Sequence, residues 1–197
     1  MREKGNHTDD QTIWRQMQQG QNQALAAIYD KYVNALYNYG RGFTAKSEVI
    51  EDAIQDLLTE IWTRRDRLAT PESVKGYLLR AFRQKLLRLL TQENRWQLVS
   101  DYSYFNLVAS PTITTREDSD ETLLFKRKLK KVINSLSARQ QEAITLRYTE
   151  NLTHQEVAEV MDIKVQTLYN LLHTATQKLG KSFQQVPHPV YTFLSLL

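Results

Sequence analysis

The chain contains no cysteine among its 197 residues, and it has only six glycines and four prolines. The absence of cysteine excludes a disulfide framework and any metal site built from thiolates. Few glycines and prolines leave room for long helices, and runs of alternating β-branched residues are scarce. We therefore predict an all-α fold.

Long apolar runs are missing as well. No run approaches the roughly 18 apolar residues that a membrane-spanning helix needs, and the first residues (MREKGNHTDDQ) lack the apolar stretch of a signal peptide. The four histidines are scattered and do not pair with carboxylates at metal-ligand spacing. A phosphate-binding glycine loop, a nucleophile elbow and a carboxylate dyad are also absent. We expect no enzyme, no metal and no cofactor, in a cytoplasmic setting.

Charge is distributed unevenly along the chain, whose formal net charge is +4. Residues 1–90 carry 14 basic and 11 acidic side chains, residues 91–121 carry 2 and 6, and residues 122–197 carry 10 and 5. The order is basic, acidic, basic. This pattern is compatible with nucleic-acid binding at both ends of the chain, although the small excess does not demand it.

The first block of the chain shows helical periodicity with clear start and stop signals. A short helix over Thr12–Gln18 ends at Gly20, and a longer helix follows. A third helix starts after Ser47 with acidic residues in its first turns, where the helix dipole favours carboxylates. A fourth begins with Thr70 as N-cap and Pro71 at the first helical position. These signals predict one small helical domain.

Residues 91–121 lose this periodicity, and Ser and Thr crowd in beside an acidic end. We predict two small helical domains joined by a flexible acidic linker. The expected boundaries are residues 9–92 for the first domain, 93–121 for the linker, 122–182 for the second domain and 183–197 for an apolar tail. The tail either packs on its own domain or binds a regulator.

The second block carries a helix-turn-helix pattern. Capping boxes occur at Ser137 with Gln140 and at Thr153 with Glu156. After the turn at residues 161–163, apolar residues recur at helical spacing, at Val165, Leu168, Leu172, Ala175 and Leu179. The opposite face shows Gln166, Asn170, His173 and Gln177. A helix pair with such a polar second helix is a common device for reading the DNA major groove.

The ordered pair of blocks resembles an extracytoplasmic-function (ECF) sigma factor of bacterial RNA polymerase, in the short type of Bacteroidetes-like bacteria. The matching words are LAAIYDKYVNALYNYG, EDAIQDLLTEIW and SVKGYLLRAFRQKL in the first block. In the second block they are LSARQQEAITLRY, LTHQEVAEVMDI and VQTLYN. The resemblance covers the chain from about Gln11 to Lys181.

This resemblance implies a promoter-specificity subunit without catalytic chemistry of its own. Its first domain would grip the clamp of core RNA polymerase and open promoter DNA at the −10 element. Its second domain would sit on the polymerase flap and read the −35 element, while the linker threads toward the active-site channel. An anti-sigma factor is a further partner that the family implies, and no small-molecule substrate is expected.

The family also suggests which residues of the first block touch polymerase and DNA. The expected polymerase contacts share the polar side of one helix and are Asp52, Gln55, Asp56, Thr59 and Glu60. The expected −10 contacts lie on the loop 68–73 and an exposed basic helix face, and are Thr70, Lys75, Arg80, Arg83, Lys85 and Arg88. Single strands bind to cationic grooves with aromatic platforms, but we expect Tyr77 and Phe82 to be mostly core. The alternative for both sets is an ordinary solvated face.

The recognition helix of the second block departs from its family. Lys164 stands at the usual Ser or Thr cap, and Tyr169 and Leu171 replace typical basic positions. The expected −35 contacts are Arg139, Arg147, Lys164, Gln166, Thr167, Tyr169, Asn170 and His173. Gln and Asn suit bidentate reading of adenine but neutralise no phosphate. Affinity must come from elsewhere, for example from Lys164, Arg139, Arg147 or the basic run 126–131.

Two other classes of protein remain open on these residues. One is a free-standing helix-turn-helix repressor or activator that binds a palindromic duplex as a dimer. The other is a protein-interaction module that has lost DNA binding, as the thinly charged recognition helix suggests. The segment EDAIQDLLTEIW discriminates between the classes, because a simple repressor does not need a polymerase-binding helix.

Overall fold

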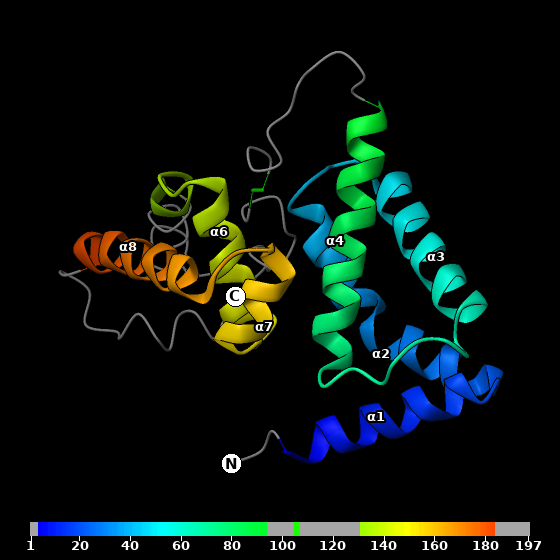
Figure 1. Ribbon diagram of the computed structural model, residues 1–197. Coiled ribbons are helices and arrows are strands. Elements are labelled where there is room, and N and C mark those ends of the chain that lie inside the picture. Colours follow the sequence, from blue (N-terminus) through cyan, green and yellow to red (C-terminus); the bar gives the residue numbers. More distant parts are fainter. Residues whose placement is uncertain (1–3, 94–104, 107–130, 184–197) are drawn as a thin grey trace, which may run out of the picture. The chain divides into compact units, whose positions relative to one another are not determined.

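The computed structural model describes residues 4–93, 105–106 and 131–183. Within these ranges the chain forms helices and no strand (Figure 1), so the all-α prediction is confirmed. The elements are α1 (Lys4–Gln18), α2 (Asn22–Arg41), α3 (Ser47–Thr63), α4 (Val74–Glu93), α6 (Ala138–Ile144), the π-helix η3 (Thr145–Thr149), α7 (His154–Met161) and α8 (Val165–Phe183). Residues 131–134 add a further helical turn.

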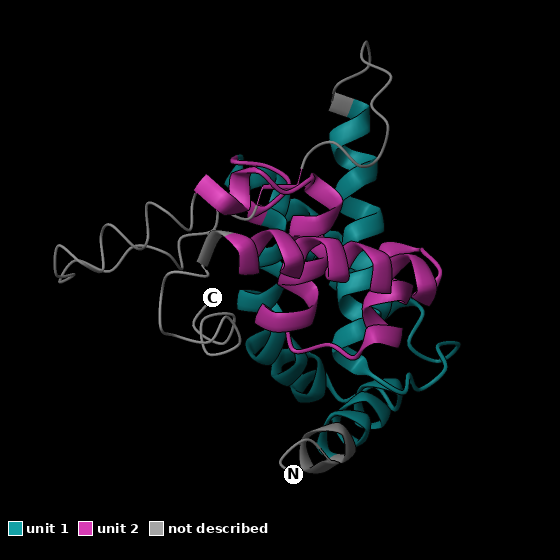
Figure 2. Ribbon diagram, turned by 90° about the vertical axis from the view of Figure 1, so that its left-hand side faces the viewer, with its two compact units in different colours: residues 1–40, 46–97 teal, residues 41–45, 98–197 magenta. Residues whose placement is uncertain are grey.

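Two compact units make up the chain (Figure 2). The first contains residues 1–40 and 46–97, and the second contains residues 41–45 and 98–197. Of the predicted linker and tail, only Glu93, Phe105, Asn106 and Phe183 fall among the described residues, and residues 126–130 of the basic run fall outside them.

The core of the first unit forms where α3 packs against α4 and α1 packs against α4. Its largest fully buried side chains include Trp14, Tyr39, Ile50 and Phe82. Gly40 allows a close approach here, because a Cβ at this position would lie 2.8 Å from Ile50 and 3.0 Å from Phe82. Glycine at the end of α2 therefore lets that helix close on the core.

The start of α4 differs from the prediction. The helix begins at Val74, and the Ser73 hydroxyl accepts a hydrogen bond from the Gly76 N–H at 3.1 Å. The expectation that Thr70 is the N-cap is wrong, because the Thr70 hydroxyl donates instead to the Gln18 side chain of α1 at 3.1 Å. The side chain that would have capped the helix has a partner in another element.

The helix-turn-helix of the second unit forms as expected. The Thr153 hydroxyl accepts from the Glu156 N–H at 3.2 Å, and the Glu156 carboxylate accepts from the Thr153 N–H at 2.6 Å. The capping box of Ser137 with Gln140 is present as well. α7 ends at Asp162, whose φ of 54° is the left-handed conformation that often terminates a helix. The turn to α8 therefore rests on local backbone chemistry.

The apolar stripe of α8 is confirmed at four of its five positions. Leu168, Leu172, Ala175 and Leu179 are buried, whereas Val165 is 38 % exposed. Val165 is exposed because it opens the helix, one turn before the stripe meets the core. Val165 therefore adds apolar surface to the exposed start of the recognition helix.

Phe105 has a defined seat on the segment that follows α2. Its side chain is 5 % exposed, and its ring meets the Phe43 ring edge-on at 5.0 Å between centroids. The Asn106 N–H donates to the Gly42 carbonyl at 2.7 Å. A Cβ on Gly42 would lie less than 3.0 Å from three atoms of the Phe105 ring. The seat therefore requires glycine at position 42.

We expect Gly42→Ala to push Phe105 out of this seat and to destabilise the protein by about 1–3 kcal/mol, as overpacking usually does. Gly180→Ala is the control, since nothing lies within 4 Å of its Cβ. In the interior of α8 that change should stabilise by about 0.5–1 kcal/mol. Thermal unfolding and hydrogen exchange at the Asn106 amide measure the effect of each variant. Equal effects of the two variants would contradict the inference that Phe105 requires glycine at position 42.

Candidate functional site

Two kinds of site are not found in the described ranges. None of the helices described there is long and apolar enough to cross a membrane. Within residues 4–93, 105–106 and 131–183, no three His, Asp or Glu side chains gather as a set of metal ligands. The candidate sites are therefore helix faces and one cleft.

The outer face of α3 carries four of the five predicted polymerase contacts. Asp52, Gln55, Asp56 and Thr59 are all exposed, while the apolar residues between them face the core. Spacings of three and four residues bring these side chains onto one side of the helix. The face presents two carboxylates and two neutral polar groups.

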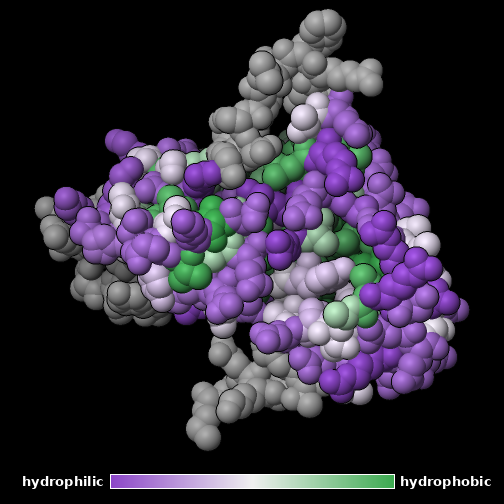
Figure 3. Space-filling view, in the orientation of Figure 1, coloured by the Kyte–Doolittle hydropathy of each residue, from purple (hydrophilic) through white to green (hydrophobic). Residues whose placement is uncertain are grey.

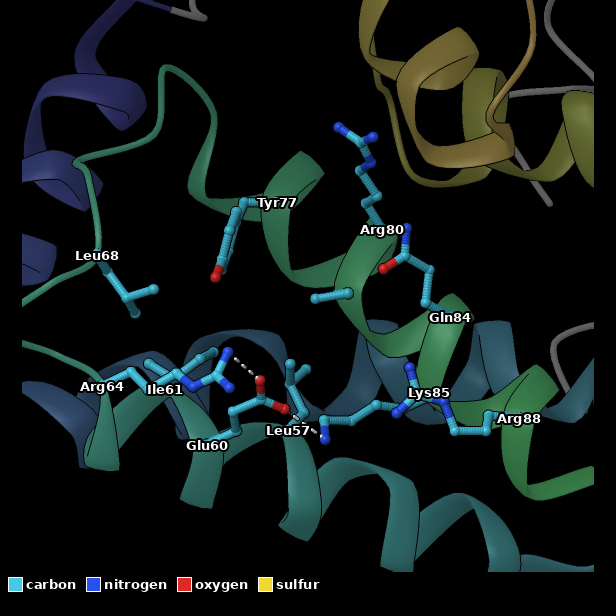
Figure 4. Close-up of a pocket in the computed structure, with 11 residues that line it drawn as sticks. Leu57, Glu60, Ile61, Arg64, Leu68, Tyr77, Arg80, Gln84, Lys85 and Arg88 are labelled. Carbon is cyan, nitrogen blue, oxygen red and sulfur yellow. Dashed lines mark ion pairs between the residues drawn. The ribbon is translucent and has the colours of Figure 1, made fainter. Parts of the chain in front are cut away.

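Glu60, the fifth residue of this set, turns toward α4. Its carboxylate pairs with Arg64 at 2.9 Å and with Lys85 at 2.7 Å (Figure 4). The hydrogen bond from Lys85 lowers the pKa of Glu60, and the charges of Lys85, Arg64 and Arg88 act in the same direction. Glu60 is thus an ionised link between the two helices. Its side chain contacts α4, whereas Asp52 and Asp56 face outward.

A cleft of about 360 Å³ opens between α3, α4 and the loop that joins them. Its lining is Leu57, Glu60, Ile61, Arg64, Leu68, Tyr77, Arg80, Ala81, Gln84, Lys85 and Arg88. Figure 3 shows apolar surface between α3 and α4, surrounded by hydrophilic residues. The cleft therefore has an apolar floor and a rim that carries four cations and one carboxylate.

Tyr77 forms one wall of this cleft, with its hydroxyl directed down toward α3 (Figure 4). The ring is half-buried and packs edge-on against Trp14, with 5.2 Å between centroids. Burial, followed by the charge of Glu60, raises the pKa of Tyr77. The phenol therefore keeps its proton. Phe82 is fully buried, as expected, whereas Tyr77 lines the cleft and is less of a core residue than predicted.

The predicted −10 contacts differ in how far they are exposed. Arg80 and Arg88 are exposed on the cleft, and Arg80 extends away from Glu60 (Figure 4). Lys75 is half-buried, Lys85 is paired with Glu60, and Thr70 is bonded to Gln18. The two exposed arginines are thus the members of the set that are presented most openly.

Arg83 does not lie on the exposed basic face, and its expected exposure is wrong. The side chain is 5 % exposed. Position 83 lies four residues after Leu79 and three before Leu86, both of which are buried. Helical spacing therefore turns this arginine toward the core of the first unit.

The recognition helix presents the predicted polar face. Lys164, Gln166, Thr167, Asn170 and His173 are all exposed. The Gln166 amide donates to the Asn170 side chain at 3.5 Å, one turn further along. The polar groups expected to read base edges therefore lie side by side on the surface of α8.

Tyr169 adds an aromatic group to this face. Its side chain is 48 % exposed and stacks on the His154 ring of α7, with centroids 4.8 Å apart and an interplanar angle of 25°. The stack joins the two helices of the motif and fixes where the tyrosine can point.

The two predicted arginine contacts of this unit are less exposed than the recognition helix. Arg147 donates from Nη1 to the Leu152 carbonyl at 2.8 Å, and both Arg139 and Arg147 are half-buried. Arg147 thus contributes to the segment that leads into α7. Its structural bond was not foreseen from the sequence.

The sequence interpretation also missed two glutamines of α1. The Gln11 and Gln18 side chains bond to the loop between α3 and α4 at Leu68, Thr70, Pro71 and Glu72. A spacing of seven residues, with Trp14 between them, is the one signal that they share a helix face. That signal does not identify the partner, which lies 50 to 61 residues further along the chain.

Comparison with known proteins matches each of the two units to a known protein region. The pattern of Sigma-70 region 2 matches residues 28–96, and that of Sigma-70 region 4 matches residues 126–179. ECF RNA polymerase sigma factor SigK from Mycobacterium sp. (strain KMS) is 28% identical over 164 residues, covering 82% of this chain and 83% of SigK. SigK from Mycobacterium sp. (strain JLS) matches with the same values.

Two solved structures share the fold. CnrH in complex with the cytosolic domain of CnrY has a TM-score of 0.59 at 17% identity, over 90% of this chain and 98% of the other. RpoE in complex with the anti-sigma factor NepR, from Bartonella quintana, has a TM-score of 0.55 at 19% identity, over 84% and 97%.

The two matched regions define a class of protein, since together they cover more than half of the chain in the order region 2, region 4. The chain belongs to the sigma-70 family, and within it to the ECF sigma factors. It binds core RNA polymerase and promoter DNA and directs transcription initiation. The region 2 match disfavours a free-standing repressor, which has no use for that unit.

A pH-dependent test follows from the pKa of His154, the ring that stacks on Tyr169. Burial, and then the charge of Arg147, lower the pKa of His154 from its ordinary value of 6.5. The unfolded chain therefore binds this proton more readily than the folded protein. The neutral imidazole contributes stability that is fully present above about pH 6.5 and is lost as the pH falls through the lowered folded pKa.

We expect Arg147→Gln to raise the pKa of His154, since it removes the second cause. Titration of the His154 ring by NMR measures this pKa in both proteins. Arg15→Gln, an exposed arginine of the first unit, is the control and should leave the value unchanged. A pKa that stays the same in Arg147→Gln would contradict the assigned cause.

Proposed function

We propose that this sigma factor grips core polymerase with the outer face of α3, captures single-stranded promoter DNA in the cleft between α3 and α4, and reads duplex DNA with α8. The functional boundaries are 9–92 for clamp binding and −10 recognition, 93–121 for the linker, 122–182 for −35 recognition and 183–197 for the tail. The observation that carries the proposal is the cleft, with its cationic rim, apolar floor and tyrosine wall.

Support for the polymerase contact comes from the row of exposed polar groups on α3. Asp52 and Asp56 lie one turn apart, with Gln55 and Thr59 beside them. Such a face complements a basic partner surface, and charge complementarity speeds association and fixes register. Glu60 contributes through its pairing with Lys85, which holds α3 against α4.

Support for strand capture comes from the chemistry of the cleft. Proteins bind single strands with a positively charged groove and aromatic side chains on which bases stack. Here Tyr77 supplies the aromatic wall, and the exposed Arg80 and Arg88 supply cations for the phosphates. The volume of about 360 Å³ falls in the range of pockets that take small-molecule-sized groups. An unstacked base of the non-template strand is the occupant we propose.

Support for −35 reading comes from the exposed amides of α8. Gln166 and Asn170 can each pair with an adenine edge through two hydrogen bonds. Lys164, at the start of the helix, contributes a phosphate contact. Tyr169, held by its stack on His154, extends this surface. Thr167 and His173 complete the proposed contact set, to which Arg139 and Arg147 add charge from its edge.

Several finer assignments belong to the same proposal. We assign the chain to the short Bacteroidetes-like type on the words quoted from its sequence, and to the cytoplasm, where the polymerase works. It supplies recognition and strand opening, and the polymerase supplies the chemistry. The solved relatives carry partners, the cytosolic domain of CnrY and the anti-sigma factor NepR. We propose an anti-sigma partner that covers these same surfaces.

The deciding experiment is reconstitution with core polymerase on genomic promoter fragments. We expect start sites that appear only when this protein is added. The double variant Asp52→Lys/Asp56→Lys should lower the affinity for core by tenfold or more, because charge pairs at interfaces have large coupling energies. Asp30→Lys, a reversal on exposed α2, is the control. Tight duplex binding without core, or unchanged core affinity, would contradict the proposal.

The recognition helix yields a separate prediction about specificity and salt. Gln166→Ala should relax the base preference at one −35 position by about 1–3 kcal/mol and leave the salt dependence of binding unchanged. Lys164→Gln should weaken all sequences alike and reduce the slope against salt by about 1. Binding of holoenzyme to randomised −35 elements at several salt concentrations measures both. An unchanged preference in Gln166→Ala would refute this register of the helix.

A further inference from the structure

The loop between α3 and α4 is held by side chains of α1. The Gln18 side-chain amide donates to the Leu68 carbonyl, and its oxygen accepts from the Thr70 hydroxyl at 3.1 Å. Both ends of one amide are therefore used on the same short segment. A loop that shifted by one residue would lose the donor or the acceptor, so this amide selects one loop conformation.

Gln11 holds the next part of the same loop. Its amide donates to the carbonyls of Pro71 and Glu72, both at 3.3 Å. Residues 68–73 have no regular secondary structure that would supply partners for these carbonyls; the bond to Pro71 is partly buried and the bond to Glu72 is exposed. Two glutamines of α1 thus bond to four polar groups of the loop, which belong to Leu68, Thr70, Pro71 and Glu72.

Trp14 stands between the two glutamines on the same face of α1. It is fully buried and packs edge-on against Tyr77, the wall of the cleft. Leu68, whose carbonyl is bonded to Gln18, lines the cleft opposite Tyr77 (Figure 4). One face of α1 therefore contacts two residues that line the cleft, Tyr77 through Trp14 and Leu68 through Gln18, while Gln11 bonds to the adjoining part of the loop.

We propose that α1 is a brace that preorganises the cleft for an unstacked promoter base, with Gln11, Trp14 and Gln18 as positioning residues. Binding is tighter when a loop is already ordered in its bound conformation, because the ordering entropy is not lost during binding. The brace acts through Leu68, Thr70 and Tyr77, and its three positioning residues are uncharged. This inference rests on the proposed function, in which the cleft takes a base.

A brace and a purely structural helix differ in what their loss changes. Loss of a structural helix lowers thermal stability and the affinity for core polymerase, and it weakens all DNA ligands alike. Loss of the brace reduces one quantity. It is the ratio of the affinities for two ligands, one with a base at the captured position and one without that base. The ratio between these two ligands is therefore the readout, because a general loss of folded protein cancels in it.

The experiment uses the holoenzyme and promoter fragments whose −10 non-template strand is single-stranded. Each base in turn is replaced by an abasic site, and the two affinities are compared. The wild-type holoenzyme should bind the intact strand much more tightly than the abasic strand at one position. Gln18→Leu should reduce that discrimination by about tenfold, since it removes two neutral hydrogen bonds. Gln11→Leu should reduce it by a smaller factor, about two- to fivefold, because both of its hydrogen bonds are long, at 3.3 Å, and one of them is exposed.

Gln19→Leu is the matched control. It makes the same chemical change one residue further along, at an exposed position after the end of α1. It should keep the wild-type ratio. Core affinity and the thermal midpoint are measured for all variants, and Gln11→Leu is read in place of Gln18→Leu if the latter does not fold.

Two results would overturn the brace. If wild type discriminates and both Gln18→Leu and Gln11→Leu keep its ratio, the brace is wrong and base capture stands. If wild type shows no base dependence at any −10 position, base capture itself is wrong and the brace falls with it. A reduced ratio in the glutamine variants, with Gln19→Leu unchanged, supports the brace.

Discussion

Everything in the first unit depends on the packing of α3 against α4. Ile54, Leu57 and Ile61 bury one side of α3, while Leu78, Phe82 and Leu86 bury one side of α4. Because a helix has only one way to turn its apolar stripe inward, this packing also decides where the polar sides face. The acidic face of α3, the basic rim of α4 and the cleft between them are consequences of the same contact.

One carboxylate, that of Glu60, offsets part of the positive charge on the rim of the cleft. Glu60 neutralises part of the rim by pairing with Arg64 and Lys85, and it joins the two helices where the cleft is open. Exposed ion pairs of this kind contribute little to stability on their own. Their effect is to engage Arg64 and Lys85, whereas Arg80 extends away from Glu60 (Figure 4).

Local signals predicted most of the fold, and the errors have both local and distant causes. Both capping boxes, the stop at Gly20 and four positions of the α8 stripe follow from residues a few places apart. Thr70 has good cap chemistry, but Gln18 takes its hydroxyl. Arg83 looks exposed by type and is buried by its place in the stripe. The candidate site was predicted as residues, whereas the cleft and its glutamine supports needed the tertiary structure.

The sparse charge at the start of the recognition helix bears on how this protein finds its promoters. Residues 164–173 contain a single lysine, Lys164, and no arginine. Non-specific affinity for DNA grows with the number of phosphates that cations neutralise. This part of the molecule therefore gives the chromosome little to hold when polymerase is absent. We therefore expect the recognition helix alone to add little to non-specific binding, so that other basic residues of the protein must supply the hold on phosphates.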